Sequence, residues 1–126
     1  DKSTLNEQIL CVLAMSINTP DCQFLKDMIK YNERIVHMDI CQNGILFKAK
    51  IVLVLTRNRL YLLNIKKKSK ELQEKETLTL RQIEGDIAIN GSSFCLNMKS
   101  KGKFTFTSLM STADEWKKWI NKCRQE

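Results

Sequence analysis

The spacing of apolar residues changes once along this 126-residue chain, and the change limits the folds it can adopt. Up to Lys30 apolar residues recur at helical spacing; beyond it they alternate with polar ones, and turn signals such as Asn-Gly follow at short intervals. The segments with strand character are RIVHMDICQ, KAKIVLVLT, RLYLLNI, ETLTLRQI, DIAIN, FCLNM and FTFTS. We therefore predict a mainly β fold of seven antiparallel strands, arranged as a bent sandwich or open barrel.

Two helices are expected before the first strand. The sequence TLNE at residues 4–7 is a capping box and predicts a helix over residues 4–16. A second short helix, with proline at its first position, is expected over residues 20–30. Together they form an N-terminal helical extension, residues 1–31, packed on a domain formed by residues 32–126. The predicted second strand is apolar on both faces, so we expect the extension to cover its outer face.

One amphipathic helix is expected at the C-terminus, in the segment STADEWKKWINKCRQE. Thr112 and Glu115 form a second capping box at its start. Its apolar residues recur at helical spacing and are Ala113, Trp116, Ile120 and Cys123. Two small sheets leave an open corner, and a helix that carries a buried tryptophan can fill it.

Charge and cysteine content restrict the partners. The net charge of +7 favours an anionic partner, which leaves nucleic acid, acidic phospholipid and acidic protein as candidates. The five cysteines form no CxxC pair and there is one histidine, so we expect reduced thiols in a cytosolic compartment and no metal or other cofactor. The longest apolar run is the length of a strand, too short to span a membrane.

Seven antiparallel strands followed by a helix with an inward tryptophan resemble the pleckstrin-homology fold, over residues 33–126. The segment KAKIVLVLTRNRLYLLN is similar to the second and third strands of that family. The segment DEWKKWI is similar to its final helix, with Trp116 matching the packed tryptophan and Trp119 the other candidate.

The layout of two helices followed by YNERIVHMDICQNGILFKAK more narrowly resembles the acylated pleckstrin-homology proteins of apicomplexan parasites. That resemblance implies a lipidated amino terminus, the cytosolic face of a secretory organelle called the microneme, and a domain that senses phosphatidic acid during exocytosis. The basic tail domain of class I myosins has a similar LT…LY strand pair and also binds acidic lipids. The resemblance thus implies a peripheral membrane module for anionic phospholipid; the alternative is a phosphoinositide-binding or protein-binding scaffold, with the N-terminal helices as a partner surface.

In the pleckstrin-homology fold, the connections after strands one, three and six meet at one open end. The resemblance therefore implies that nine lysines gather there and bind lipid, namely Lys48, Lys50, Lys66, Lys67, Lys68, Lys70, Lys99, Lys101 and Lys103. The first connection also carries Ile45, Leu46 and Phe47, which either insert into the headgroup layer or form the buried start of the second strand. Arg57 and Arg59 belong to the opposite turn and are not expected to take part.

Headgroup preference follows from the residues around the first connection. Inositol-phosphate binders of this family place a lysine late in the first strand and a Lys-x-Arg at the start of the second. This chain has Lys48-x-Lys50, but Ile40, Cys41 and Gln42 occupy the late first-strand positions. Because lysine is a point charge and arginine a planar fork, we expect phosphatidic acid rather than a phosphoinositide.

Catalysis and nucleic-acid binding are not expected. An enzyme needs a nucleophile and a base, or paired acids, within mutual reach, and the single histidine, His37, belongs to a predicted strand. There is no glycine-rich phosphate loop. Phe94, Phe104 and Phe106 are spaced as core residues, so the exposed aromatic platform of a single-strand binder is missing.

Overall fold

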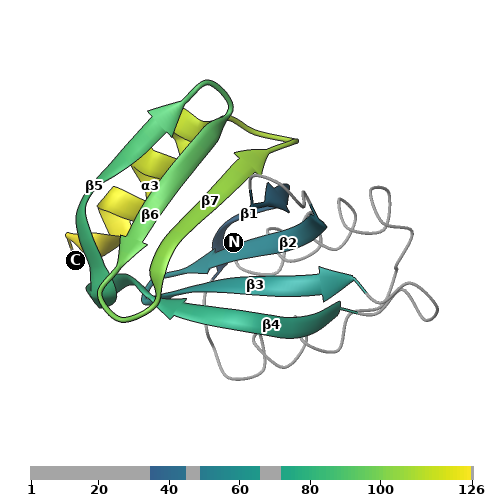
Figure 1. Cartoon of the computed structure of the whole chain (residues 1–126), viewed down its shortest axis with the longest axis horizontal. Helices are drawn as coiled ribbons and strands as arrows, with labels where there is room; N and C mark the ends of the chain where they lie inside the picture. Colours follow the sequence, from purple (N-terminus) through teal and green to yellow (C-terminus); the bar gives the residue numbers. More distant parts are fainter. Residues whose placement is uncertain (1–34, 45–48, 66–71, 126) are drawn as a thin grey trace.

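The computed structural model describes residues 35–44, 49–65 and 72–125 (Figure 1). In chain order the elements are β1 (Ile35–Asn43), β2 (Ala49–Thr56), β3 (Arg59–Ile65), β4 (Leu72–Thr79), the 3-10 helix η1 (Leu80–Gln82), β5 (Ile83–Asn90), β6 (Ser93–Met98), β7 (Gly102–Ser108) and α3 (Ala113–Arg124). The strands form one antiparallel 7-stranded sheet in the order β4-β3-β2-β1-β7-β6-β5. The predicted sheet and final helix are therefore confirmed.

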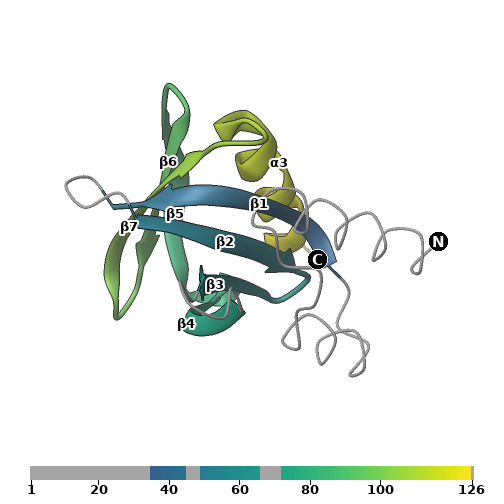
Figure 2. The same cartoon turned by 90° about the vertical axis from the view of Figure 1, so that its right-hand side faces the viewer.

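The sheet bends where β1 passes from one half to the other. β1 pairs along its length with β2, but only its last residues, Cys41 to Asn43, pair with β7. Figure 1 shows β1 to β4 running at a steep angle to β5 to β7, with α3 behind β5 and β6. Figure 2 shows β1 and β2 crossing in front of β5. The helix contacts β1, β5, β6 and η1, so it fills the corner that the bend leaves open.

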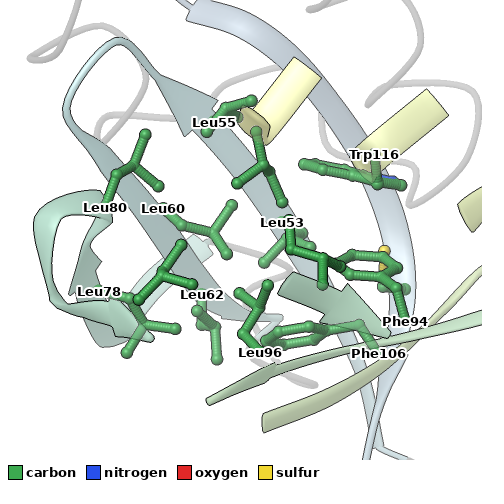
Figure 3. Packing of buried hydrophobic residues seen from close by; sticks show 14 of the residues in the cluster. Leu53, Leu55, Leu60, Leu62, Leu78, Leu80, Phe94, Leu96, Phe106 and Trp116 are labelled. Atoms are coloured by element: carbon green, nitrogen blue, oxygen red, sulfur yellow. The ribbon is translucent and has the colours of Figure 1, made fainter. Parts of the chain in front are cut away.

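The core lies between the two halves of the sheet and α3 (Figure 3). Trp116 is fully buried, with its ring stacked on Phe94 at 5.7 Å between centroids, and Phe94 in turn contacts Phe106 at 5.5 Å. Leucines from β2, β3 and β4 meet these aromatic rings from the other side, as the labelled side chains of Figure 3 show. Trp116 is thus the packed tryptophan, while Trp119 is only partly buried.

Both faces of β2 are buried, as its sequence predicts. Leu53 belongs to the main core cluster, whereas Val52 and Val54 point to the other face and have no exposed area. The helices predicted over residues 4–16 and 20–30 lie outside the described residues, so their role as the cover of this face stays a prediction.

The fourth strand begins earlier than its sequence indicates. Predicted over residues 76–83, it starts at Leu72 and ends at Thr79, and the rest of that segment forms η1 and the start of β5. The polar residues Gln73 and Glu74 enter the strand because β3 offers them partners in Asn64 and Leu63. Cross-strand hydrogen bonding therefore outweighs low strand propensity at an outer strand, where charged side chains stay in water.

Within the described ranges, no helix is long and apolar enough to cross a membrane.

Replacing Trp116 with Ala should lower the free energy of unfolding by about 3 to 5 kcal/mol, because it leaves a large cavity between α3 and Phe94. Urea unfolding followed by far-UV circular dichroism measures the loss. Trp119→Ala is the matched control, and it should cost clearly less because that ring is already partly in water. Equal losses would contradict the assignment of Trp116 as the core residue.

Candidate functional site

Of the nine lysines predicted to bind lipid, the structure describes the side chains of four, and all four are exposed. Lys50 lies near the start of β2, opposite Gln42 of β1. Lys99 and Lys101 belong to the turn between β6 and β7, and Lys103 lies at the start of β7, opposite Asn97. The others, Lys48, Lys66, Lys67, Lys68 and Lys70, lie outside the described residues, as do Ile45, Leu46 and Phe47.

Lys101 is held against β4. Its ammonium group forms an ion pair with Glu76, and it also donates a hydrogen bond to the backbone carbonyl of Thr77 at 3.3 Å. The Lys101 side chain is 45% exposed, so water screens the pair and its contribution to stability is small. The carboxylate nevertheless offsets part of the positive charge that Lys101 would present to an anionic ligand.

The end of β1 and the start of β2 lie together at one end of the sheet, but the end of β1 pairs with the last residues of β7, Phe106 to Ser108, and not with its start. Lys103, at the start of β7, therefore lies farther along that strand, toward the β6–β7 turn. Figure 1 shows the β6–β7 turn at the lower left, near the end of β4, while β3 ends at the right. Lys99 is also tied to η1, since its backbone N–H donates to the carbonyl of Gln82 at 2.9 Å. A common surface for all nine lysines stays a prediction, because residues 45–48 and 66–71 are not described.

A buried carboxylate, Asp39 in β1, gathers the most extensive polar network of the described residues. Its side chain is 2% exposed and lies on the face that Cys41 turns to the core. Asp39 Oδ2 accepts hydrogen bonds from the Ser108 hydroxyl, the Ser111 N–H and hydroxyl, and the indole Nε1–H of Trp116 at 3.2 Å. Oδ1 accepts from the N–H of Met110 at 3.0 Å. The network fixes the connection between β7 and α3, together with the tryptophan.

His37 adjoins this network, but the arrangement differs from that of a hydrolase. Its Nε2 lies 3.1 Å from Ser111 Oγ, and its ring meets Trp116 edge-on at 4.5 Å between centroids. In a catalytic triad the histidine stands between serine and aspartate. Here Ser111 Oγ stands between them and donates to Asp39 at 2.7 Å, so His37 is placed to donate to the hydroxyl rather than to take its proton. The prediction of His37 as a sheet residue is confirmed.

The thiol of Cys41 is a structural one. Cys41, Cys95 and Cys123 form no disulfide bond within the described ranges. Burial, with a smaller contribution from the charge of Asp39, raises the pKa of the Cys41 thiol far above its usual range. A thiol that stays protonated is a poor nucleophile, so Cys41 serves as a core side chain.

Sequence reasoning missed two groups of residues. The sequence held one indication of the first group: Asp39 is a single acidic residue at an inward-facing position of a strand with alternating polarity. The second group is a cluster of arginines beside the β2–β3 turn, which includes Arg57 and Arg59, both left out of the expected site. These arginines come from distant parts of the chain, and no local pattern joins them.

The fold of this chain has counterparts of known structure. The DH/PH fragment of PDZRHOGEF in its complex with human RhoA matches with a TM-score of 0.65 at 17% identity, over 98% of this chain and 40% of that one. The DH/PH domain of human ARHGEF11 in a ternary complex with RhoA and its inhibitor gives 0.67 at 14% identity, over 98% and 40%. The Slm1-PH domain, in complex with inositol-4-phosphate, gives 0.51 at 17% identity, over 72% and 94%.

This chain has the pleckstrin-homology fold. The match to Slm1-PH decides it, because it covers 94% of a chain that is a pleckstrin-homology domain alone, whereas this chain spans 40% of the first DH/PH fragment. No family model matches the sequence, and no curated protein does. The broader resemblance is therefore confirmed at the level of the fold, and the narrower one to the acylated apicomplexan proteins gains no support.

Replacing Asp39 with Asn should lower the free energy of unfolding by about 2 kcal/mol, because an amide must turn its NH2 toward at least one of the donors that now face a carboxylate. Asp86→Asn is the matched control at an exposed position of β5, where we expect a change within about 0.5 kcal/mol. Chemical denaturation of both variants tests this. A loss at residue 39 no larger than at residue 86 would contradict the role of the network.

His37 should make stability fall at mildly acidic pH. Burial lowers the pKa of His37, and the charges of Asp39 and Glu115 only partly oppose that shift. Above the unfolded pKa of 6.5 the imidazole is neutral in both states and contributes nothing to the pH dependence. As the pH falls below that value, the unfolded chain binds a proton before the folded one does, so folding is disfavoured.

The His37→Gln variant lacks this titration, and His37 is the only histidine of the chain. The free energy of unfolding of the natural protein should therefore decrease relative to that of the variant between about pH 7 and pH 5. Urea titrations at several pH values measure the difference. Parallel curves for the two proteins would show that the folded-state pKa is not lowered.

Proposed function

We propose that this domain is a peripheral membrane module that binds anionic phospholipid through the lysines of its strand connections. The observation that carries the proposal is that the described connection lysines, Lys50, Lys99, Lys101 and Lys103, all expose their side chains on a pleckstrin-homology fold. Each lysine close to an anionic bilayer adds about 1 kcal/mol. These four would together supply at most about 4 kcal/mol, which is millimolar binding.

Such weak attraction suits a module that works with a second anchor. One acyl chain or one basic patch is marginal by itself, and the two together hold a protein at a membrane. The resemblance stated above suggests an acylated amino terminus and the cytosolic face of a secretory organelle such as the microneme, where lipid sensing would contribute to exocytosis.

Phosphatidic acid is the proposed lipid. The late residues of β1 are Ile40, Cys41 and Gln42, none of which is basic. Ile40 and Cys41 are also buried, and Gln42 lies opposite Lys50. Slm1-PH was solved with inositol-4-phosphate, which makes a phosphoinositide the comparison lipid. Single lysine ammonium groups suit one exposed phosphomonoester better than they suit a ring of several phosphates.

We also propose that the domain is not an enzyme. Its one histidine neighbours a serine hydroxyl that already donates to Asp39, and the Cys41 thiol is buried. The exposed lysine side chains are suited to binding an anionic partner and not to breaking a bond.

Vesicle flotation tests the proposal. Phosphatidylcholine vesicles that contain phosphatidic acid should recruit the domain, and added salt should reduce recruitment because the lysines are exposed. Two charge reversals, Lys48→Glu with Lys50→Glu and Lys99→Glu with Lys103→Glu, should each weaken binding at least tenfold.

Lys118→Glu with Lys122→Glu is the control, because it makes the same change in net charge on α3 and should leave flotation nearly unchanged. If only one of the two connection variants weakens binding, the surface is not shared and the proposal of a common site is wrong. If phosphatidylinositol phosphates are bound more tightly than phosphatidic acid at equal charge, the headgroup assignment is wrong. Absence of binding to any anionic vesicle would leave the protein-binding alternative.

A further inference from the structure

A polar hollow of about 340 Å³ lies beside the β2–β3 turn, away from Lys50. Eight residues line it, contributed by that turn, the end of β4, η1 and the last turn of α3: Arg57, Asn58, Arg59, Thr79, Leu80, Arg81, Cys123 and Arg124. Of these eight described residues, four are arginine and none is aspartate or glutamate. The hollow therefore gathers four guanidinium groups.

Several hydrogen bonds hold these elements together before any ligand arrives. The N–H of Leu80 in η1 donates to the carbonyl of Asn58 in the turn at 3.0 Å. Thr56 Oγ1 accepts from the N–H of Arg59 and donates to its carbonyl, both at 3.2 Å. The backbones that carry Arg57, Arg59 and Arg81 are thus fixed relative to one another, which lowers the entropy cost of binding.

Two hydrogen bonds hold the side chain of Arg124. Its Nη1 donates to Asn121 Oδ1 and its Nη2 donates to the carbonyl of Ile83, each at 3.3 Å. The side chain is half-buried, whereas Arg57, Arg59 and Arg81 are exposed. Because a guanidinium has five N–H donors, two bonds at Arg124 leave others to point elsewhere. Arg57 and Arg59 have further interactions of their own, so a ligand would add to their contacts.

The C-terminus of α3 opposes this positive field only weakly. Its carbonyl groups carry about half a negative charge, and the N–H of Gln125 already bonds the carbonyl of Asn121. The full positive charges of Arg81 and Arg124 outweigh that partial charge and attract an anion, in addition to whatever interactions Arg57 and Arg59 already make.

We propose that this hollow binds a compact soluble anion with two or more phosphate groups. The planar fork of arginine matches phosphate oxygens in pairs, which a lysine cannot do. The volume is at the lower end of the range for small-ligand sites. Arg57 follows Lys50 by seven residues along extended chain, about 23 Å, which separates the hollow from the start of β2, whereas Lys99 lies closer to it through its backbone hydrogen bond to Gln82.

Inorganic triphosphate is a suitable probe, used with the whole chain at physiological ionic strength. Binding is followed by the arginine Nε–Hε signals in proton–nitrogen correlation spectra, which report on the guanidinium groups themselves. We expect saturable shifts in the signals of Arg57, Arg59, Arg81 and Arg124. Arg59→Gln with Arg81→Gln should weaken binding by roughly tenfold for each guanidinium lost.

Three further variants sharpen the test. Arg59→Lys with Arg81→Lys keeps the charge but loses the forks, and should recover only part of the affinity. Arg81→Gln alone, at an exposed residue of η1, should still weaken binding if the double variant folds poorly. Lys50→Gln with Lys103→Gln removes two charges elsewhere and should leave triphosphate binding unchanged while it weakens flotation with phosphatidic acid vesicles.

The vesicle assay separates the two sources of phosphate. The Arg59→Gln and Arg81→Gln double variant should float as well as the natural protein, because the hollow is assigned a soluble ligand. If it loses vesicle binding and triphosphate does not bind, the phosphate is a lipid headgroup and the proposal of a soluble ligand is overturned. Shifts that never saturate, or that respond equally to Lys50→Gln with Lys103→Gln, would show general charge attraction and would also overturn it.

Discussion

The buried carboxylate of Asp39 is the interaction on which the closed form of this domain depends. A bent sheet has an open corner, and α3 can fill it only if the chain leaves β7 in the right direction. Asp39 sets that direction by accepting hydrogen bonds from Ser108, Ser111 and Met110, and from the indole of Trp116. One side chain of β1 thereby connects the strand, the exit from β7 and the helix.

The hydrophobic core and this polar network meet at Trp116. The ring stacks on Phe94, and its Nε1–H donates to Asp39. Burial of a tryptophan leaves its N–H without water, so a partner inside the protein is needed. The acid in turn is tolerated in the interior because five donors replace its hydration. Each group makes the burial of the other possible, and hydrophobic packing gains a fixed geometry.

Periodicity predicted the parts of the fold that are amphipathic by themselves. The first three strands, the last strand and the C-terminal helix were found within a residue or two, and Trp116 was chosen correctly between two tryptophans. The early start of β4 was missed, because Gln73 and Glu74 have low strand propensity and pair only since β3 lies beside them.

The sites could be predicted less well. Lysines in predicted connections were expected to be exposed, and Lys50, Lys99, Lys101 and Lys103 are. The ion pair of Lys101 with Glu76 depends on where the β6–β7 turn meets β4, and the gathering of Arg59 with Arg124 depends on where α3 ends. Both are contacts between segments far apart in sequence, and spacing along the chain carries no information about them.

The order of the strands leaves β4 and β5 as the outer members of the sheet, where unpaired backbone groups could recruit a strand of another chain. Both are poorly suited to that. Register shifts interrupt the pairing of β4 with β3 and of β5 with β6, and Gly85 in β5 adopts a φ of +67° that breaks the extended run. Glu74 and Lys75 on β4, and Glu84 and Asp86 on β5, add charge along these borders. A high local concentration of this domain should therefore not cause amyloid-like stacking of its outer strands.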